Sequence, residues 1–365
     1  MMLEKHGHGG DVWTAAELYG LDKNSFLDFS SNMNPLGPPE AAGRIIQEEW
    51  RRELSRYPDP DCRELRQRIG EVYGVSASCV LAGNGAAEII DLAVRSRSPR
   101  TVGLLQPSFR EYATAAQRAG AGIVDIPLSA EREFDPVWSL AEVQKAAREA
   151  ELFLFGHPNN PTGRLLPPEF VRQLTAAGKP VILDEAFIDF SGEEERVSFI
   201  RQAAESDRLC VVRSMTKFYT VPGLRLGFAV AGQGWIEAMK RLQVEWSVNG
   251  LAQRIGQAVL GDEEYARATR DWLHEESAWL TQALTGLGLR ATPSAANYLL
   301  FRIPSEWGVT IHSLQEAMGR RGILIRSAAT YQGLDDRYGR SAIRSHEDNM
   351  RLVAALAACL EDLRG

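Results

Sequence analysis

The sequence predicts an α/β protein with a seven-stranded, mostly parallel sheet, helices on both faces of that sheet, and a smaller α+β domain. One observation is that short apolar, β-branched runs alternate with amphipathic helical stretches between residues 75 and 232. A second is that the pattern becomes long, polar and helical after Trp235. A third is length, because 365 residues suffice for a large domain and a smaller one.

The seven expected strands follow one another along the chain. They are residues 79–83, 102–106, 122–128, 152–156, 181–187, 209–214 and 226–232. Helical segments between them, such as 86–95 and 109–119, are short enough to be the crossover connections of a parallel sheet.

The remaining segments are expected to build the smaller domain. A helical region runs to Leu287, and two or three strand-like pieces follow, NYLLFRI, GILIRS and SAIRS. The first 50 or so residues contain Pro35, Pro38 and Pro39, which enforce extended chain. We therefore expect an N-terminal arm and part of the small domain in 1–50, a large cofactor-binding domain in 51–270, and the C-terminal small domain in 271–365.

Composition argues against several classes of function. The net charge of -7 and pI near 5.6 disfavour nucleic acid or anionic membrane as partners, because those surfaces select basic patches. The four cysteines form no C-x-x-C pair, which argues against a zinc site and favours a reducing compartment. The N-terminus lacks a signal peptide's apolar core, and no apolar run approaches the ~20 residues that span a bilayer. We expect a cytoplasmic protein without a metal.

Polar motifs follow the predicted strands, at the edge where an open parallel sheet binds ligands. Gly83-Asn84-Gly85-Ala86 opens a helix and points free N–H groups at an anion. Asn160 lies in a rigid, proline-rich loop, and Asp184 closes the fifth strand. Taken alone, the glycine motif equally fits an ordinary βα turn, the Asn160 loop is a turn, and a solvated strand end explains Asp184 better than a site does.

The sixth strand leads into a motif that suits a phosphate beside an imine. Ser214, Thr216 and Lys217 follow it, and Arg225 comes eight residues after the lysine in a Gly-Leu-Arg turn. Hydroxyls, an arginine fork and backbone N–H groups would bind the phosphate, while the amine would bind an aldehyde. A lysine taken alone is more often a surface residue.

The ordered set of motifs resembles that of fold-type I pyridoxal-phosphate (PLP) enzymes of the class I/II aminotransferase superfamily. The matching segments are Gly83-Asn84-Gly85, Asn160-Pro161-Thr162-Gly163, Asp184-Glu185-Ala186, and Ser214-Met215-Thr216-Lys217 with Arg225. The resemblance spans roughly the whole chain. Within the superfamily, the sequence is most similar to histidinol-phosphate aminotransferases and threonine-phosphate decarboxylases.

The resemblance implies that PLP is the cofactor and that Lys217 holds it as a Schiff base. It also implies that Asp184 pairs with the pyridinium nitrogen, that Asn160 hydrogen-bonds the phenolic oxygen, and that Phe109 stacks on the ring. The residues that it places around the cofactor phosphate are Gly85, Ala86, Ser214, Thr216 and Arg225.

Two positions bear on assembly and on reaction type. Tyr57 resembles the tyrosine that such enzymes extend to the neighbouring subunit's cofactor phosphate, so we expect a homodimer. Phe187 stands where aminotransferases often carry a tyrosine that donates to the phenolic oxygen. Its presence leaves more of that task to Asn160 and weakens the transaminase assignment.

The N-terminus favours a decarboxylase. His6-Gly7-His8-Gly9-Gly10, followed by DFSSNMNPLGP at 28–38, resembles the opening of threonine-phosphate decarboxylases of cobalamin biosynthesis. This implies an arm whose His8 closes over a substrate phosphate; a floppy terminus or an incidental metal-binding pair is the alternative. Asn32 is a weaker candidate for substrate binding.

Two arginines near the C-terminus are candidate substrate anchors. Arg344, at the end of Ser341-Ala342-Ile343-Arg344, matches the position of the superfamily's carboxylate-binding arginine. Arg326 would bind either the carboxylate or the substrate phosphate. Each is otherwise a surface arginine at a strand end.

We therefore expect PLP-dependent decarboxylation of L-threonine O-3-phosphate to (R)-1-amino-2-propanol O-2-phosphate. The alternative is histidinol-phosphate transamination with 2-oxoglutarate. A catalytically silent PLP-fold sensor is disfavoured because the Lys217 set is intact and no basic DNA-binding segment is present. A P-loop is disfavoured because Gly83-Asn84-Gly85 lacks the required spacing.

Overall fold

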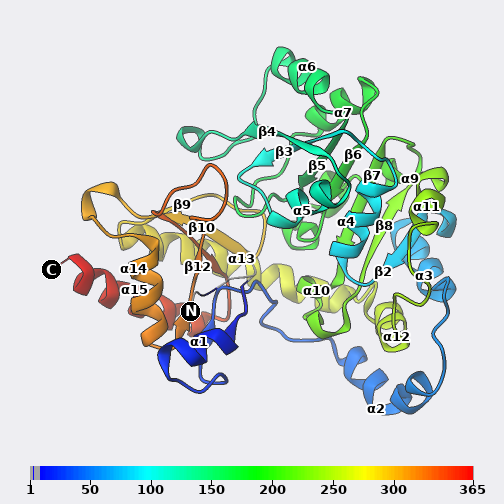
Figure 1. The fold of residues 1–365 in the computed structure, drawn as a ribbon. Helices are drawn as coiled ribbons and strands as arrows, with labels where there is room; N and C mark the ends of the chain where they lie inside the picture. The colour runs from blue at the N-terminus through cyan, green and yellow to red at the C-terminus, as the bar shows by residue number, and fades with distance from the viewer. Residues whose placement is uncertain (1–2, 4–8, 365) are drawn as a thin grey trace.

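The computed structural model describes residue 3 and residues 9–364, and it gathers the seven expected strands into one sheet (Figure 1). The order in the sheet is β2-β8-β7-β6-β5-β3-β4. The strands are β2 (Val80–Gly83), β3 (Thr101–Gln106), β4 (Gly122–Pro127), β5 (Leu152–Gly156), β6 (Val181–Asp184), β7 (Leu209–Ser214) and β8 (Gly227–Ala231). All neighbours are parallel except β8, which is antiparallel to both β2 and β7. The expected mostly parallel sheet is confirmed.

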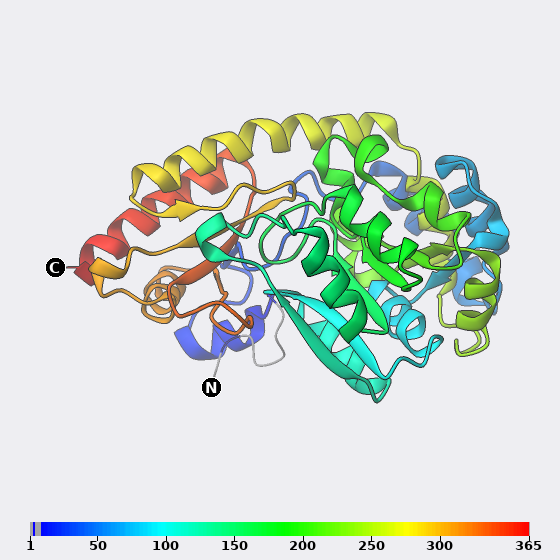
Figure 2. The same cartoon turned by 90° about the horizontal axis from the view of Figure 1, so that it is seen from above.

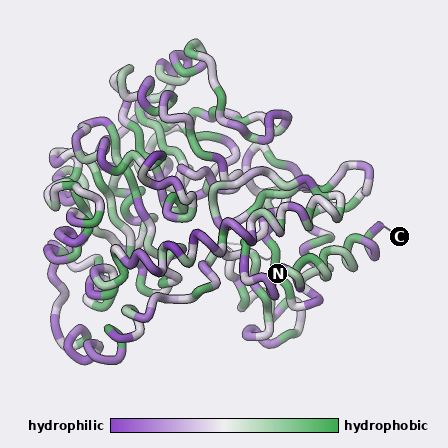
Figure 3. Tube along the Cα trace, turned by 180° about the vertical axis from the view of Figure 1, so that it is seen from behind, coloured by the Kyte–Doolittle hydropathy of each residue, from purple (hydrophilic) through white to green (hydrophobic). Residues whose placement is uncertain are grey.

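The central strands are apolar throughout because helices cover both faces of the sheet. Successive residues of β5 alternate between two cores: Leu152 and Leu154 pack in one, Phe153 and Phe155 in the other. The first core takes α4 (Ala86–Arg95), α5 (Arg110–Arg118) and α11 (Gln233–Lys240). The second takes α3 (Arg63–Tyr73), α6 (Leu140–Glu149), α7 (Pro168–Ala176), α9 (Ile200–Ala204) and α12 (Gly250–Val259). Hydrophobic strands inside and polar helices outside are visible in Figure 3.

A second, antiparallel sheet forms near the C-terminus in the order β12-β13-β10-β9. Its strands are β9 (Arg290–Ala291), β10 (Tyr298–Arg302), β12 (Arg326–Ser327) and β13 (Tyr338–Ala342). The helices α14 (Ile311–Arg320) and α15 (His346–Arg364) belong to the same part of the chain. The remaining short elements are α8 (Glu194–Val197), α10 (Met215–Phe218), η1 (Ala77–Cys79), η2 (Ala130–Arg132), η3 (Ile188–Ser191), η4 (Pro222–Leu224) and η5 (Ser305–Trp307).

The N-terminal segment divides between the two parts. Its strand β1 (Leu27–Asp28) pairs in parallel with β11 (Ile323–Leu324), and α1 (Val12–Tyr19) packs on α14. By contrast, α2 (Glu40–Leu54) packs on α12 beside the large sheet. The long helix α13 (Glu263–Gly286) runs along one side of the molecule from the large sheet to the small one (Figure 2). The expected boundary at residue 270 therefore falls inside a continuous helix.

Over the described part of the chain, every helix is too short or too polar to cross a bilayer.

Candidate active site

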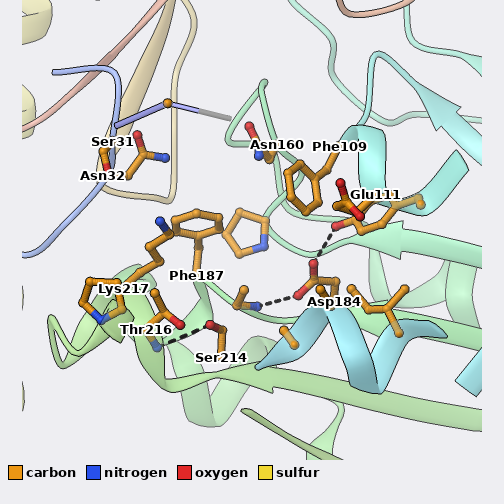
Figure 4. A pocket seen from close by; sticks show the side chains of 18 of the residues that line it. Ser31, Asn32, Phe109, Glu111, Asn160, Asp184, Phe187, Ser214, Thr216 and Lys217 are labelled. Atoms are coloured by element: carbon orange, nitrogen blue, oxygen red, sulfur yellow. Dashed lines mark hydrogen bonds between the residues drawn. The ribbon is translucent and has the colours of Figure 1, made fainter. Parts of the chain in front are cut away.

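A cavity of about 430 Å³ opens at the carboxyl ends of β5, β6 and β7, where the large sheet meets the N-terminal segment and β12–β13 (Figure 4). This is the edge at which an open α/β sheet is expected to bind its ligand. Ten of the predicted site residues line the cavity: Asn32, Ala86, Phe109, Asn160, Asp184, Ser214, Thr216, Lys217, Arg225 and Arg326.

Lys217 comes from α10, immediately after β7, and its side chain projects into the cavity (Figure 4). Burial lowers the pKa of its amine to about 8, with further lowering by the guanidinium groups of Arg340 and Arg225. A larger fraction of the neutral, nucleophilic amine is therefore present near neutral pH than for an exposed lysine. This is the property that a lysine needs to bind an aldehyde.

Asp184 ends β6 as a buried carboxylate with few polar neighbours. Its Oδ2 accepts a hydrogen bond of 2.8 Å from the Tyr112 hydroxyl, and its Oδ1 accepts one of 3.1 Å from the Ala186 N–H. Burial raises the pKa of Asp184 to about 6 despite these two bonds. A cationic partner would compensate the buried charge, and the protonated ring nitrogen of PLP is such a partner.

The sequence prediction did not include Tyr112. Its ring packs edge-on to Phe109, with centroids 5.6 Å apart. Phe109 is the N-cap residue of α5 and Tyr112 lies in its first turn, where the Tyr112 N–H donates to the Phe109 carbonyl at 3.1 Å. The spacing from Phe109 was the signal in the sequence that could have identified Tyr112.

Gly85 and Arg225 lie against each other at the start of α4, and no side chain fits at position 85. We call the first turn of α4 together with Arg225 the phosphate cradle. Gly85 has φ +83, and a Cβ built there would lie 2.4 Å from Arg225 Nη2. The Gly85 N–H itself donates to the Gly83 carbonyl at 2.8 Å. The backbone donors for an anion are therefore those of the first turn of α4, where Ala86 and the unpredicted Ala87 both line the cavity.

Asn160 has its amide oriented by the small sheet. Its Oδ1 accepts a hydrogen bond of 2.7 Å from Arg340 Nη1 and a longer one of 3.4 Å from the Tyr331 hydroxyl. The oxygen is thereby occupied, and the amide NH₂ is the group available to donate. A donor at this position fits the expected contact with the phenolic oxygen of PLP.

Arg340 lines the cavity, whereas the predicted anchor Arg344 is not among the lining residues. Arg340 lies opposite Arg326 on the neighbouring strands β13 and β12, and both side chains are buried and line the cavity. Arg344 comes two residues after β13 ends, and its Nε pairs with Asp348 at 3.0 Å outside the cavity. The sequence analysis did not include Arg340, which lies four residues before Arg344 inside β13.

The N-terminal segment closes one side of the cavity. Asn32 is buried, and its Oδ1 has no hydrogen-bond partner within the described residues, which fits a polar ligand. Gly9 also lines the cavity, and a Cβ there would lie 2.1 Å from the Ser30 carbonyl oxygen. The Gly10 N–H donates to Ser30 Oγ at 2.8 Å. His8 lies outside the residues that the structure describes.

Tyr57 lies outside the cavity of its own chain. It is 85% exposed, and its ring packs against that of Trp246 with centroids 5.2 Å apart. Its role at a neighbouring subunit's cofactor remains a prediction.

Behind the site, the buried Arg213 of β7 pairs with three carboxylates. Its guanidinium lies 3.0 Å from Glu185, 2.9 Å from Asp189 and 2.8 Å from Glu194. These contacts fix the segment after β6, which carries Phe187 into the cavity. Burial raises the pKa of Asp189 to about 7.

The family model for aminotransferases of class I and II matches residues 24–356. The chain belongs to this family. A threonine-phosphate decarboxylase of Salmonella typhimurium is 40% identical, with 98% of this chain and 97% of that protein covered. A histidinol-phosphate aminotransferase of Ralstonia nicotianae is 31% identical, with 96% and 93% covered. The solved histidinol-phosphate aminotransferase of Clostridium acetobutylicum superposes with a TM-score of 0.85 at 28% identity, with 92% and 99% covered.

Family membership confirms three expectations: the fold, an enzyme, and PLP as its cofactor. The chain's own residues fit that cofactor. Lys217 would hold its aldehyde carbon, Asp184 its ring nitrogen, and the cradle of Ala86, Ala87 and Arg225 its phosphate.

Proposed function

We propose that this enzyme decarboxylates L-threonine O-3-phosphate in cobalamin biosynthesis. The observation that carries the proposal is the pair of buried arginines, Arg326 and Arg340, beside Lys217. Besides Lys217 and Arg225, which we assign to the cofactor, these two guanidinium groups line the cavity and suit a substrate with two anionic groups. The 40% identical threonine-phosphate decarboxylase acts on such a substrate by its name.

The arginine closer to the cofactor is the better anchor for the substrate carboxylate. Arg340 bonds to Asn160, which is expected at the phenolic oxygen, so its guanidinium lies on the side of the reacting carbon. Arg326 packs at a distance of 5.6 Å from the Tyr331 ring centre and is left for the phosphate. Asn32 is a further candidate for substrate binding, since its buried Oδ1 can accept a hydrogen bond from the substrate.

In this proposal each residue has its own role in the decarboxylation. PLP, when bound, supplies an electron sink for the pair released at the substrate's α-carbon. Arg340 orients the carboxylate so that the bond to the α-carbon breaks and CO₂ leaves. Lys217 returns a proton to the α-carbon, where the carboxylate stood. Asp184 and Phe109 both line the cavity, where Asp184 would keep the ring nitrogen protonated and Phe109 would stack on the ring.

Histidinol-phosphate transamination is the second candidate, since relatives with that name are 31% identical. Phe187 counts against it. This side chain lines the cavity and packs edge-on to Tyr298 at 5.1 Å, so it offers no hydroxyl where aminotransferases often have one.

We also propose a homodimer in the cytosol. Tyr57 and Trp246 together expose an aromatic surface, as expected for a contact with a second subunit. The four cysteines are free thiols, as a reducing compartment favours.

Two assays with the PLP-loaded protein test the reaction. The first supplies threonine phosphate and measures CO₂; the second supplies histidinol phosphate with 2-oxoglutarate and measures glutamate. We expect CO₂ in the first and little glutamate in the second. Turnover in the second assay alone would replace decarboxylation by transamination.

A further inference from the structure

The connection between β12 and β13 carries Tyr331 into the cavity. Tyr331 is 6% exposed, its hydroxyl donates to Asn160 Oδ1 at 3.4 Å, and its ring centre lies 5.6 Å from the Arg326 guanidinium carbon. The ring therefore stands between the residue expected beside the cofactor and the residue proposed for the substrate phosphate. The proposed reaction assigns no task to it.

The residue next to Tyr331 is held from the large sheet. Gln332 Nε2 donates to Asp125 Oδ2 at 2.6 Å, and Gln106 Nε2 donates to Asp125 Oδ1 at 2.8 Å. Asp125 belongs to β4, and Gln106 ends β3 shortly before Phe109. One exposed carboxylate thus links the Tyr331 connection to the segment that supplies the stacking aromatic.

We propose that Tyr331 is a specificity-determining residue that limits the size of the substrate between Lys217 and Arg326, and that Asp125 positions it through Gln332. The proposal rests on the proposed function, because Arg326 is the assumed phosphate anchor. The cavity of about 430 Å³ is near the lower end of ligand sites and must hold the cofactor as well. A buried, planar ring there leaves room for a small amino-acid phosphate and excludes the imidazole of histidinol phosphate.

Binding by the PLP-loaded protein tests the role of Tyr331. Wild type, Tyr331→Phe, Tyr331→Leu and Tyr331→Ala are titrated with threonine phosphate and with histidinol phosphate, and the visible absorbance of the cofactor is followed. We expect Tyr331→Ala to shift the ratio of the two affinities towards histidinol phosphate by about tenfold or more. Tyr331→Phe keeps the wild-type ratio because its ring remains.

Tyr331→Leu guards against a failure of the alanine variant to fold, since it retains apolar bulk without a planar ring. We expect it to shift the ratio in the same direction as alanine but less far. An unchanged ratio in the folded leucine or alanine variant overturns the size limit. A phenylalanine variant that behaves like the alanine variant overturns it too, because the hydroxyl would then be the active group.

Asp125 is tested by separating KM from kcat. Asp125→Ala removes two hydrogen bonds from an exposed carboxylate, so we expect KM for threonine phosphate to rise about two- to tenfold with kcat unchanged. Hydrogen exchange in residues 328–337 should become faster. Asp125→Asn keeps one acceptor oxygen and so only one of the two hydrogen bonds, and it should lie between the wild type and Asp125→Ala in both measurements.

Asp335→Ala is the matched control, because Asp335 pairs with Arg337 inside the same connection. It should leave KM as in the wild type. A wild-type KM and wild-type exchange in Asp125→Ala would overturn the positioning role.

The outcome for Tyr331 is separable from the outcome for the reaction. If the wild type releases no CO₂ from threonine phosphate and Tyr331→Ala still gains affinity for histidinol phosphate, the reaction is wrong and the size limit stands. If the wild type releases CO₂ and the affinity ratio is unchanged in Tyr331→Ala, the reaction stands and the size limit is wrong.

Discussion

Asp184 is a buried carboxylate whose expected cationic partner is the ring nitrogen of the cofactor, not another residue of the chain. Its pKa of about 6 lies above the 3.8 of an unperturbed aspartate because the carboxylate is buried. Ionising it therefore opposes folding: the protonated form stabilises the fold at low pH, and this contribution is lost as pH rises through about 6. Without a cation at the ring-nitrogen position, ionisation of Asp184 destabilises the folded protein at neutral pH.

Asp184→Asn is expected to stabilise the cofactor-free protein and to weaken its hold on PLP. At pH about 8 the gain in unfolding free energy should reach roughly 1–3 kcal/mol, because a buried carboxylate with a raised pKa no longer has to ionise. Near pH 4 the difference should vanish. Urea unfolding at both pH values and equilibrium dialysis with PLP measure the two effects, and a less stable variant at the higher pH would contradict them.

Residues whose role depends on local spacing were predictable, and residues placed by tertiary contacts were not. Lys217, Asp184 and Arg225 stand directly after or before apolar runs, so strand ends located them. Arg340 was missed because its strand begins with the weakly apolar Tyr338-Gly339. Nothing local to Tyr331 indicates that Asn160, 171 residues away, receives its hydroxyl.

At the scale of elements, the segment from β6 to α8 is held by the charge cluster around Arg213. The apolar run 181–187 predicted a longer strand, but β6 ends at Asp184. The chain turns there because Glu185 faces inward, where it accepts from Ser198, from the Phe199 N–H and from Arg213. A sequence pattern could not reveal this, since Arg213 reads as an ordinary end of the strand LCVVRS.

Arg213→Met is expected to lower the unfolding free energy by about 3–5 kcal/mol, because it leaves buried carboxylates without their partner. The loss should be smaller at pH about 5 than at pH about 8, since the pKa of Asp189 is raised to about 7 and protonation removes one of the charges. Thermal unfolding at both pH values tests this. Arg196→Met is the control, because it breaks only the exposed pair with Glu193 and should be as stable as the wild type. An equal loss of unfolding free energy in the two variants would refute the role of the cluster.

At the scale of the whole molecule, large apolar side chains are exposed around α2 and the segment before α12. Leu54 is 70% exposed, Tyr57 85% and Val244 76%. The helix α2 lies at the side of the molecule opposite α15 (Figure 1). An exposed apolar surface of this kind suits association with a second subunit. The sequence predicted the fold class, but the fold class alone does not locate this surface.

Leu54→Asp combined with Val244→Asp is expected to convert a dimer into monomers and to weaken PLP binding, because Tyr57 could no longer reach a second subunit. Light scattering gives the mass, and dialysis gives the affinity for PLP. Val137→Asp is the control, being 52% exposed before α6 and remote from α2. A monomeric wild-type protein that binds PLP tightly would contradict the assembly.

The antiparallel strand β8 has a consequence for how the enzyme can lose its cofactor. Ser214 at the end of β7 pairs with Gly227 at the start of β8, so Lys217 and Arg225 belong to the loop of one hairpin. The lysine expected to hold the aldehyde and the arginine expected at the phosphate would thus unfold as a single cooperative unit. Opening of this hairpin would weaken both contacts with the cofactor together, so the pairing of β7 with β8 would set one barrier to loss of the cofactor by unfolding.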